Sequence, residues 1–377
     1  MVDYPKDWKV VKLGQLCQIK TGTKNNEDKV IGGKYPFFVR SSVVERIDTF
    51  SYDTESILVP GEGNIGSIFH YIDGKFDVHQ RVYAITNFSN RVHARYIYWY
   101  MKRNFGDYAL TQTSKATVDS LRLPSFKEFL IYFPQIKEQK AIAKTLMTFD
   151  RHIENLERLI QKKKMIRDGA VEDLMTGKIR LDGFNGEWEE KCLAKICNIY
   201  DGTHQTPKYT NNGIRFVSVE DISNLKDSRK FISINDFRKD FKIYPENKDI
   251  LMTRIGDIGT PCLLKDDEKI AYYVSLALLK NIKINSKYLY QYIRSSNFKN
   301  ELDKRILHHA TPIKINKNDI GKCQVNYPTD IKEQEAIASI LTSMDEEIGN
   351  LEKEKAKIEK IKAGAMDDLL TGKVRLI

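Results

Sequence analysis

The sequence contains little cysteine, no long apolar run and no targeting pattern at its start. Its five cysteines are scattered and form no CxxC pair, which argues against a disulfide framework and against a zinc site. No uncharged apolar stretch approaches the roughly 18 residues of a membrane span. The first residues, MVDYPKDW, lack the charge and hydrophobicity pattern of a signal peptide. We therefore expect a cytoplasmic protein without a membrane partner.

Short motifs of familiar enzymes are also missing. The chain has no GxSxG, HExxH, P-loop or Asn-Pro-Pro-aromatic motif, and its seven histidines do not cluster at metal-ligand spacing. Only Glu246, Asp267 and Lys269 loosely resemble a metal-nuclease pattern, and the first half of the chain offers no equivalent. We expect a non-catalytic chain with no metal site and no cofactor of its own. A self-sufficient nuclease using these three residues is the weaker alternative.

The charge balance of the chain is basic. It has 61 Lys and Arg against 51 Asp and Glu, a net charge of +10 and a pI near 9.1. This balance points to a polyanionic partner. A basic soluble enzyme would show the same balance, so the partner must be identified from other features.

One stretch of the sequence occurs twice. Residues Ile136 to Leu181 begin IKEQKAIAKTL and end GAVEDLMTGKIRL, and residues Ile331 to Leu376 begin IKEQEAIASIL and end GAMDDLLTGKVRL. The copies stay in one register, 195 positions apart, from end to end. A register kept over this length indicates an internal duplication.

Each copy has the pattern of one long helix. Its apolar residues alternate three and four positions apart, which is the spacing of a coiled-coil seam. Pro134 and Pro328 precede the two helices, and Asp330 with Glu333 resembles a capping box. The seam residues are Ile142, Leu146, Phe149, Ile153, Leu156 and Ile160 in the first copy and Ile337, Leu341, Met344, Ile348 and Leu351 in the second.

The two helices are expected to pair with each other. Because a whole domain separates the copies, an antiparallel pair within one molecule is the simplest arrangement. The first helix is basic at 162–167 and the second is acidic at 345–352, so antiparallel pairing brings opposite charges together. Exposed ion pairs are weak, so they set orientation more than stability. For one such helix alone, a helical hairpin or a dimerisation zipper would be the simpler interpretation.

The domains before the helices are duplicated too. Their openings, DWKVVKLGQLCQIKTGT and EWEEKCLAKICNIYDGT, place Trp8 and Trp188, and Gly22 and Gly202, 180 positions apart. Short strand-like runs and a few helices follow in each domain. Residues 77–86 and 271–280 each have the pattern of one buried strand.

We therefore predict an α+β fold. It consists of two mixed α/β domains, residues 1–133 and 182–328, each followed by a long helix, residues 134–181 and 329–377. The two helices are predicted to form an intramolecular antiparallel coiled coil.

Polar loops of the two domains are candidates for binding double-stranded DNA. Arg and Lys side chains suit guanine, and Asn and Gln suit adenine. Each residue alone is more simply a solvated loop residue, but the set, on a basic duplicated scaffold, favours DNA. The candidates are Thr23, Lys24, Asn25, Gln80, Arg81, Thr113 and Lys115 in the first half and Thr203, His204, Gln205, Lys208, Arg254, His308 and His309 in the second.

Two dissimilar halves with similar openings, each followed by a near-identical helix, resemble the specificity (S) subunits of type I restriction–modification systems. The resemblance covers the full length and is carried by PQIKEQKAIA (134–143), PTDIKEQEAIA (328–338), LMTGKIRL (174–181), LLTGKVRL (369–376) and YDGTHQTP (200–207). The first half departs from the family pattern, because KTGTKNN replaces the DGTHQTP type of sequence and GEGNIG lacks the arginine of RIGDIG.

This resemblance implies that each domain is a target-recognition domain reading half of a bipartite, asymmetric DNA sequence. The helices would space the domains and bind two modification (methyltransferase) subunits, which would carry S-adenosylmethionine chemistry on adenine. Restriction subunits would add ATP- and Mg2+-dependent translocation and cleavage. The chain itself would be a non-catalytic specificity subunit. A stand-alone, repressor-like DNA-binding protein is the alternative.

Overall fold

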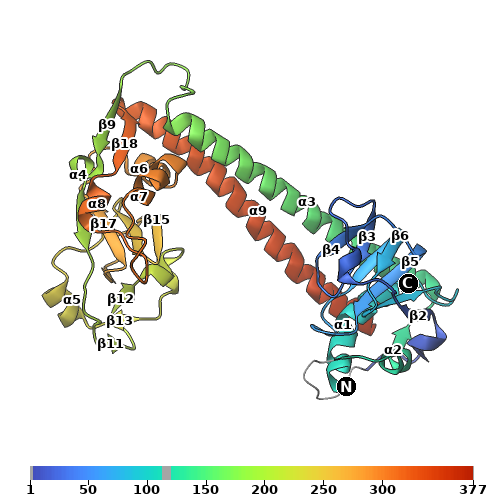
Figure 1. The fold of residues 1–377 in the computed structure, drawn as a ribbon. Helices are drawn as coiled ribbons and strands as arrows, with labels where there is room; N and C mark the ends of the chain where they lie inside the picture. The colour runs from blue at the N-terminus through green and yellow to red at the C-terminus, as the bar shows by residue number, and fades with distance from the viewer. Residues whose placement is uncertain (1–2, 113–119, 377) are drawn as a thin grey trace. The chain divides into compact units, whose positions relative to one another are not determined.

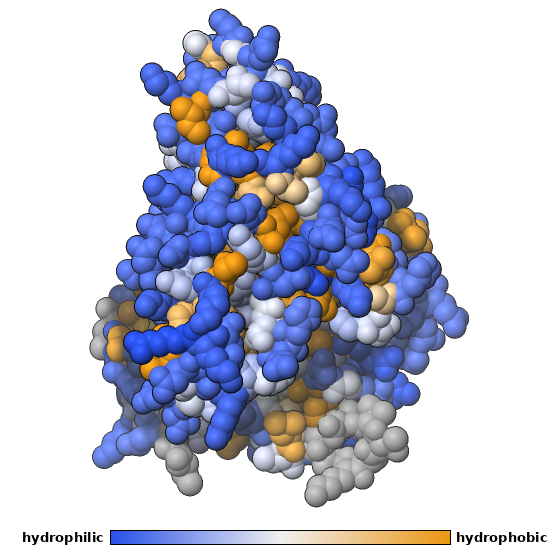
Figure 2. Space-filling view, turned by 90° about the vertical axis from the view of Figure 1, so that its left-hand side faces the viewer, coloured by the Kyte–Doolittle hydropathy of each residue, from blue (hydrophilic) through white to orange (hydrophobic). Residues whose placement is uncertain are grey.

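The computed structural model describes residues 3–112 and 120–376 (Figure 1). Its contacts divide the chain into two compact units, Met1–Glu157 with Lys353–Ile377, and Arg158–Glu352. Each unit combines one domain with the beginning of one long helix and the end of the other. Within the described residues no helix is long and apolar enough to cross a membrane, and the face drawn in Figure 2 is mostly hydrophilic.

Each copy of the repeated stretch forms one uninterrupted helix, as predicted. Helix α3 comprises Ile136–Met175 and helix α9 comprises Ile331–Thr371. A glycine with positive φ follows each helix, Gly177 at 69° and Gly372 at 75°. This left-handed conformation ends a helix at little cost only in glycine, which has no Cβ.

Helices α3 and α9 lie side by side and antiparallel (Figure 1). In the first unit Asp150 of α3 pairs with Lys362 of α9. In the second unit Lys163 of α3 pairs with Glu347 of α9 at 2.7 Å. The residue number of the α9 partner decreases as that of the α3 residue increases. This order confirms the predicted antiparallel pair.

The beginnings of both helices pack into domain cores. Helix α3 enters the first core beside Leu369 and Leu370 from the end of α9. Helix α9 enters the second core beside Val171 and Leu174 from the end of α3. Of the predicted seam residues, Ile142, Leu146, Leu156, Ile160, Ile337, Leu341 and Ile348 are buried, and Phe149, Ile153, Met344 and Leu351 are half-buried.

Glu138 and Glu333, at the same place in the two copies, each hold an arginine from the end of the other copy. The Arg375 guanidinium donates two hydrogen bonds of 2.8 Å to Glu138. The Arg180 guanidinium donates hydrogen bonds of 2.7 and 2.8 Å to Glu333, whose side chain is fully buried. Such bidentate pairs are directional as well as strong. Arg180 thus takes the carboxylate that the predicted capping box would have used.

Gln139 and Gln334 follow these glutamates and join each helix to its domain. The Oε1 atom of Gln139 accepts a hydrogen bond from the His93 backbone N at 2.8 Å, and that of Gln334 accepts one from the Asn285 backbone N at 2.8 Å. Each Nε2 donates to the carbonyl of the proline that precedes its helix, at 2.9 and 2.7 Å. The repeated Glu-Gln pair therefore has a structural role in both units.

The first domain is built on one six-stranded sheet. Its elements are β1 (Lys9–Lys12), β2 (Gln18–Thr21), β3 (Tyr35–Phe38), β4 (Val44–Ile47), β5 (Tyr52–Pro60), β6 (His70–Val78), β7 (Val82–Thr86), α1 (Ala94–Thr111), α2 (Leu123–Glu128) and β8 (Leu130–Phe133), with 3-10 helices η1 (Leu13–Gln15) and η2 (Asn26–Asp28). The strand order is β2-β7-β5-β6-β3-β4, and β1 pairs separately with β8. Helix α1 buries Tyr96 and Trp99 in the core.

The second domain has the same plan with a divided sheet. Its elements are β9 (Trp188–Cys192), α4 (Leu193–Ile196), β10 (Asn198–Asp201), β11 (Tyr209–Thr210), β12 (Ile214–Val217), η3 (Val219–Asp221), η4 (Leu225–Asp227), β13 (Phe231–Ile232), α5 (Ile234–Asp240), β14 (Ile250–Ile255), β15 (Asp257–Leu263), β16 (Ile270–Tyr272), β17 (Leu276–Lys280), α6 (Ser286–Ile293), α7 (Ser296–Asp303), α8 (Lys317–Gly321) and β18 (Gln324–Pro328). The sheets are β10-β17-β14-β15, β11-β13-β12-β16 and β18-β9. The charged run KDDEK at 265–269 lies between β15 and β16, where the first domain has the single strand β6. Burying consecutive charges is costly, so the strand is interrupted there.

Residues 77–86 and 271–280 each contain a turn, so the prediction of a single strand is wrong at both places. The Val82 backbone N donates to the His79 carbonyl at 2.9 Å, and the Leu276 backbone N donates to the Tyr273 carbonyl at 2.9 Å. These are the i to i+3 hydrogen bonds of β-turns. The turns bring polar residues to the ends of the strands.

Candidate DNA-binding edge of each domain

A glycine begins the polar loop at the same point in both domains. After β2, a Cβ on Gly22 would lie 1.8 Å from the Val78 carbonyl oxygen. After β10, a Cβ on Gly202 would lie 2.4 Å from the Tyr273 carbonyl oxygen. Both distances are far below van der Waals contact, so only glycine fits. This close approach explains the Gly-Thr pair that the two openings share.

The first-domain loop lies against the turn between β6 and β7. The Gln80 backbone N donates to the Lys24 carbonyl at 2.8 Å, and the Gln80 side chain donates to the Asn25 Oδ1 atom. The structure thus brings together the candidates Thr23, Lys24 and Asn25 with Gln80 and Arg81. All of these side chains except the half-buried Lys24 are exposed. Their contact with DNA stays a prediction.

Arg40, which was not among the sequence candidates, belongs to the same cluster. The Nη1 atom of Arg81 lies 3.0 Å from the Glu62 carboxylate, and that of Arg40 lies 3.5 Å from it. One carboxylate shared by two guanidinium groups leaves the cluster positive. Burial lowers the pKa of His79, and Arg40 and Arg81 lower it further, which favours the neutral ring. The parallel pairing of β3 with β6 explains the position of Arg40, because residues after parallel strands meet at one edge.

Two first-domain candidates, Thr113 and Lys115, lie outside the described residues. The chain that follows them is placed at the same edge. Ser120 forms a bridge with Glu62, and the Leu121 backbone N donates to the Gly61 carbonyl at 2.8 Å. The GEGNIG turn is therefore a junction of three polar segments.

In the second domain Thr203 fixes the equivalent loop. Its backbone N donates to the Tyr272 carbonyl at 3.1 Å, and its carbonyl accepts from the Val274 backbone N at 3.0 Å. Its hydroxyl accepts a hydrogen bond from the Gln205 backbone N at 3.2 Å. The exposed candidates in this loop are His204, Gln205 and Lys208.

The loop that carries His308 and His309 also reaches this edge. The Gly256 backbone N, in the turn between β14 and β15, donates to the Ile313 carbonyl at 2.8 Å. Both histidines are exposed. Two segments of candidates far apart in the sequence thus lie at the same edge of the β10-β17-β14-β15 sheet.

Arg254 is the one second-domain candidate that is buried, with 7% of its surface exposed. Its guanidinium pairs with Asp201, the last residue of β10. The Tyr272 hydroxyl supports this strand end by donating to the Asp201 carbonyl at 3.2 Å. The Nε atom of Arg254 is buried without a hydrogen-bond partner in the described part of the chain. The pair joins the RIGDIG turn to the YDGT segment at the base of the loops.

At the two positions equivalent to this ion pair the first domain has no charged residue. The strand registers place Thr21 where the second domain has Asp201, and Gly61 where it has Arg254. A Cβ on Gly61 would lie 2.7 Å from a ring carbon of Tyr83, which stands where the second domain has an alanine. The two domains therefore present different chemistry at the same edge.

Two residues of the nuclease alternative, Glu246 and Asp267, interact with other residues of the fold. Lys280 pairs with Glu246 and lies 2.8 Å from Asp249. Asp267 accepts a hydrogen bond from the Asn247 backbone N at 3.0 Å. Over residues 3–112 and 120–376 no group of three or more His, Cys, Asp or Glu side chains could hold a metal ion. The geometry of this region is that of a charged surface loop.

Known proteins resemble this chain over its length. The model of the type I restriction modification DNA specificity domain matches it twice, over residues 5–163 and 185–360. The chain is 24% identical over 409 residues to the type I restriction enzyme MjaVIII specificity subunit of Methanocaldococcus jannaschii, with 99% of this chain and 94% of that protein covered. It is 29% identical over 180 residues to the type I restriction enzyme EcoDI specificity subunit of Escherichia coli, with 46% and 39% covered.

A solved structure shows the same fold. The crystal structure of the type I restriction–modification S subunit from M. genitalium superposes with a TM-score of 0.70 at 19% identity, covering 98% of this chain and 97% of that one. The two matches of the family model account for most of the sequence, one for each half of the duplication. The chain therefore belongs to the family of type I restriction–modification DNA specificity domains.

Proposed function

We propose that this chain recognises the DNA target of a type I restriction–modification complex, and that each domain reads one half of a bipartite, asymmetric site. One observation supports this most directly. Equivalent strand edges gather polar loops in both domains, yet the second domain has Asp201 and Arg254 where the first has Thr21 and Gly61. Two copies of one half-sequence would call for matching side chains at these edges.

In the same proposal, partner subunits carry out the catalytic reactions. Two modification subunits would supply S-adenosylmethionine-dependent methylation of adenine, and restriction subunits would supply ATP- and Mg2+-dependent translocation and cleavage. The duplicated framework supports one attachment in each unit, since the Glu138–Arg375 and Glu333–Arg180 pairs build the same junction twice. In this assembly the chain is the non-catalytic part that positions the others on DNA.

Methylation-motif mapping tests the proposal. Cells producing this chain with a modification subunit should methylate adenines in two unlike half-sequences separated by a gap, and cells lacking the chain should not. Arg81→Ala should relax the first half-sequence alone. Lys195→Ala, at an exposed position in α4, is the matched control and should leave the motif unchanged. A continuous or palindromic motif would contradict the proposal of a bipartite, asymmetric target site.

A further inference from the structure

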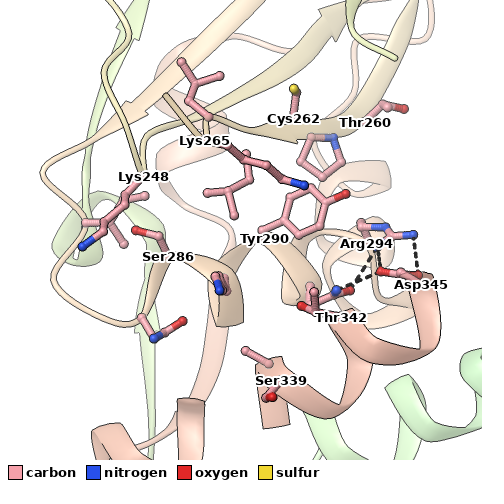
Figure 3. A pocket seen from close by; sticks show the side chains of 18 of the residues that line it. Lys248, Thr260, Cys262, Lys265, Ser286, Tyr290, Arg294, Ser339, Thr342 and Asp345 are labelled. Atoms are coloured by element: carbon pink, nitrogen blue, oxygen red, sulfur yellow. Dashed lines mark hydrogen bonds and ion pairs between the residues drawn. The ribbon is translucent and has the colours of Figure 1, made fainter. Parts of the chain in front are cut away.

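A large groove lies in the second unit. We call it the second cleft; its volume is about 1720 Å³. Figure 3 shows Thr260 and Cys262 of β15 on one side, Tyr290 of α6 in the middle, and Ser339 and Thr342 of α9 on the other side. Sheet, short helix and long helix therefore all contribute to one concave surface.

The charge of the second cleft is unevenly distributed. Asp345 is already neutralised, because Arg294 pairs with it and Arg167 lies 3.1 Å away. Carboxylates remain on the α9 wall, at Glu335 and Glu346. Exposed lysines outside α9 also line the cleft, and we call them the lysine rim: Lys248, Lys265, Lys287 and Lys299. Apolar side chains form part of the lining between them, from Pro261, Leu263, Ile282, Ile284 and Ala338.

The first unit has an equivalent groove, the first cleft, with a volume of about 580 Å³. Asp150 lines it as Asp345 lines the second cleft, and the two residues are 195 positions apart. Their cationic partners from the opposite helix, Lys362 and Arg167, are 195 positions apart as well. The two clefts are thus copies of one site.

Aromatic side chains explain why the first cleft is smaller. The strand registers place Tyr71 where the second cleft has Leu263, since these residues pair with the equivalent positions of β5 and β14. His93 precedes α1 and donates a backbone hydrogen bond to Gln139, and Asn285 precedes α6 and donates one to the equivalent Gln334. His93 and Asn285 are therefore equivalent. Counting six residues on from each aligns Trp99 with Gln291. Both aromatic rings line the first cleft and are bulkier than Leu263 and Gln291, which line the second.

We propose that the second cleft docks an acidic, amphipathic segment of a protein partner, and that the first cleft does not dock it equally well. The lysine rim would pair with carboxylates of the segment, and the apolar lining would bury its hydrophobic side chains. This inference rests on the proposed function, in which the partner is the modification subunit. Two copies of that subunit then bind with unequal affinity, and the tighter copy binds the second unit.

A nucleic acid fits the second cleft less well than a protein segment. Glu335 and Glu346 would repel phosphates along the α9 wall, and the apolar lining offers phosphates no partner. Lys248 and Lys265 flank the start of β14, whereas Arg254 lies near its end. The basic rim is therefore separate from the edge that carries the candidate DNA residues.

Titration of the full chain with the modification subunit, read by native mass spectrometry, tests the inference. The unmodified chain should bind two copies in two steps of different affinity. Lys265→Glu with Lys287→Glu should weaken the tighter step at least about tenfold, because like charges placed opposite each other are repulsive. DNA affinity of the chain alone should stay unchanged. Lys195→Glu with Lys239→Glu, exposed in the same unit, is the matched control.

A second variant tests the cleft by changing its volume and leaves its charge unchanged. Ser339→Trp, at an exposed position on the α9 wall, should fill the cleft and weaken the same step. If both variants bind two copies of the modification subunit with unchanged affinity, the second cleft is not the docking site. The proposed function would remain intact. A loss of DNA affinity with partner binding retained would make the cleft a nucleic-acid groove and overturn the inference. An unmodified chain that binds no modification subunit would overturn both.

Discussion

The Arg375 guanidinium and the Glu138 carboxylate are joined by two hydrogen bonds of 2.8 Å across 237 positions of sequence. The same pair occurs between Arg180 and Glu333. Each carboxylate opens one copy of the repeat, and each guanidinium closes the other copy. The duplication therefore does more than supply two helices, because each domain is completed by the end of the helix that starts at the other domain.

Removing one member of the buried pair should destabilise the second unit. Arg180→Ala leaves the Glu333 carboxylate, which is fully buried, without its cation. Such a loss costs about 3–5 kcal/mol of unfolding free energy. Urea denaturation followed by circular dichroism measures this difference in unfolding free energy between Arg180→Ala and the unmodified chain.

The control for this experiment is Lys191→Ala. Lys191 pairs with Glu189 on the surface, and both side chains are more than two-fifths exposed, at 44% and 42%. Its loss should shift the denaturation midpoint far less, since water solvates both charges. Equal midpoints for the two variants would show that the buried pair is not a structural clamp.

Alanine at Gly202 should disturb recognition of one half-site. The added Cβ would lie 2.4 Å from the Tyr273 carbonyl oxygen, so the loop after Thr203 must shift. We expect a loss of about 1–3 kcal/mol in binding, the value of one base contact, confined to the second half-sequence. Binding to duplexes altered in one half at a time measures this.

Gly349→Ala is the matched control, because nothing lies within 4 Å of a Cβ there and the residue is inside α9. It should leave DNA binding unchanged and raise stability by about 0.5–1 kcal/mol. A Gly202→Ala variant that weakened both half-sequences alike would contradict the independence of the two edges.

Replacing residues 182–327 with another domain of the family should change one half of the methylated motif only. Arg180, Glu333 and Gln334 lie outside this segment, so the clamp and the attachment of α9 remain available. Motif mapping gives the readout. The same replacement carrying Glu333→Ala is the control and should lose activity through misassembly. A change in both half-sequences would show that the domains do not read DNA independently.

The second unit should lose stability in acid through Asp345. Burial alone would raise the pKa of Asp345, but hydrogen bonds from Arg294 and Gln291 outweigh it and hold the pKa below its ordinary value. A carboxyl with a lowered folded pKa stabilises the protein above the unfolded pKa of about 3.9 and loses this contribution as pH falls through the folded pKa. Asp345→Asn should therefore flatten the fall in stability below about pH 4.

Thermal unfolding between neutral pH and pH 3 checks this expectation. Asp182→Asn, at an exposed position in the same unit, should keep the slope of the unmodified chain. An Asp345→Asn variant with that same acid slope would show that this carboxyl is not a source of the pH dependence.

The long helices and their pairing could be predicted because their causes are local or periodic. Apolar spacing of three and four residues specifies a helix and its buried stripe. The repeat of that pattern 195 positions later indicated an internal partner, and the charges at 162–167 and 345–352 fixed the direction. The pair of Lys163 with Glu347 bears this out. The register of the repeat and the positions of the charges can both be read directly from the sequence.

The composition of the candidate DNA-binding edges was only partly predictable. Loop composition drew attention to Gln80 and Arg81, and the structure places them beside Asn25. Arg40 was missed, because it reaches the same edge only through the parallel pairing of β3 with β6. A strand pairing between distant segments leaves no local periodic signal.

By itself the sequence determined the duplication and the two long antiparallel helices, whereas DNA as the partner stays a prediction. Tertiary structure decided which polar residues are buried and which are exposed. It placed Arg254 beneath the surface against Asp201, gave Glu333 an arginine partner in place of a helix cap, and formed two clefts of different volume, of which the smaller is lined by Trp99. Burial and ion pairing depend on which distant side chains meet, and residue order alone does not contain that information.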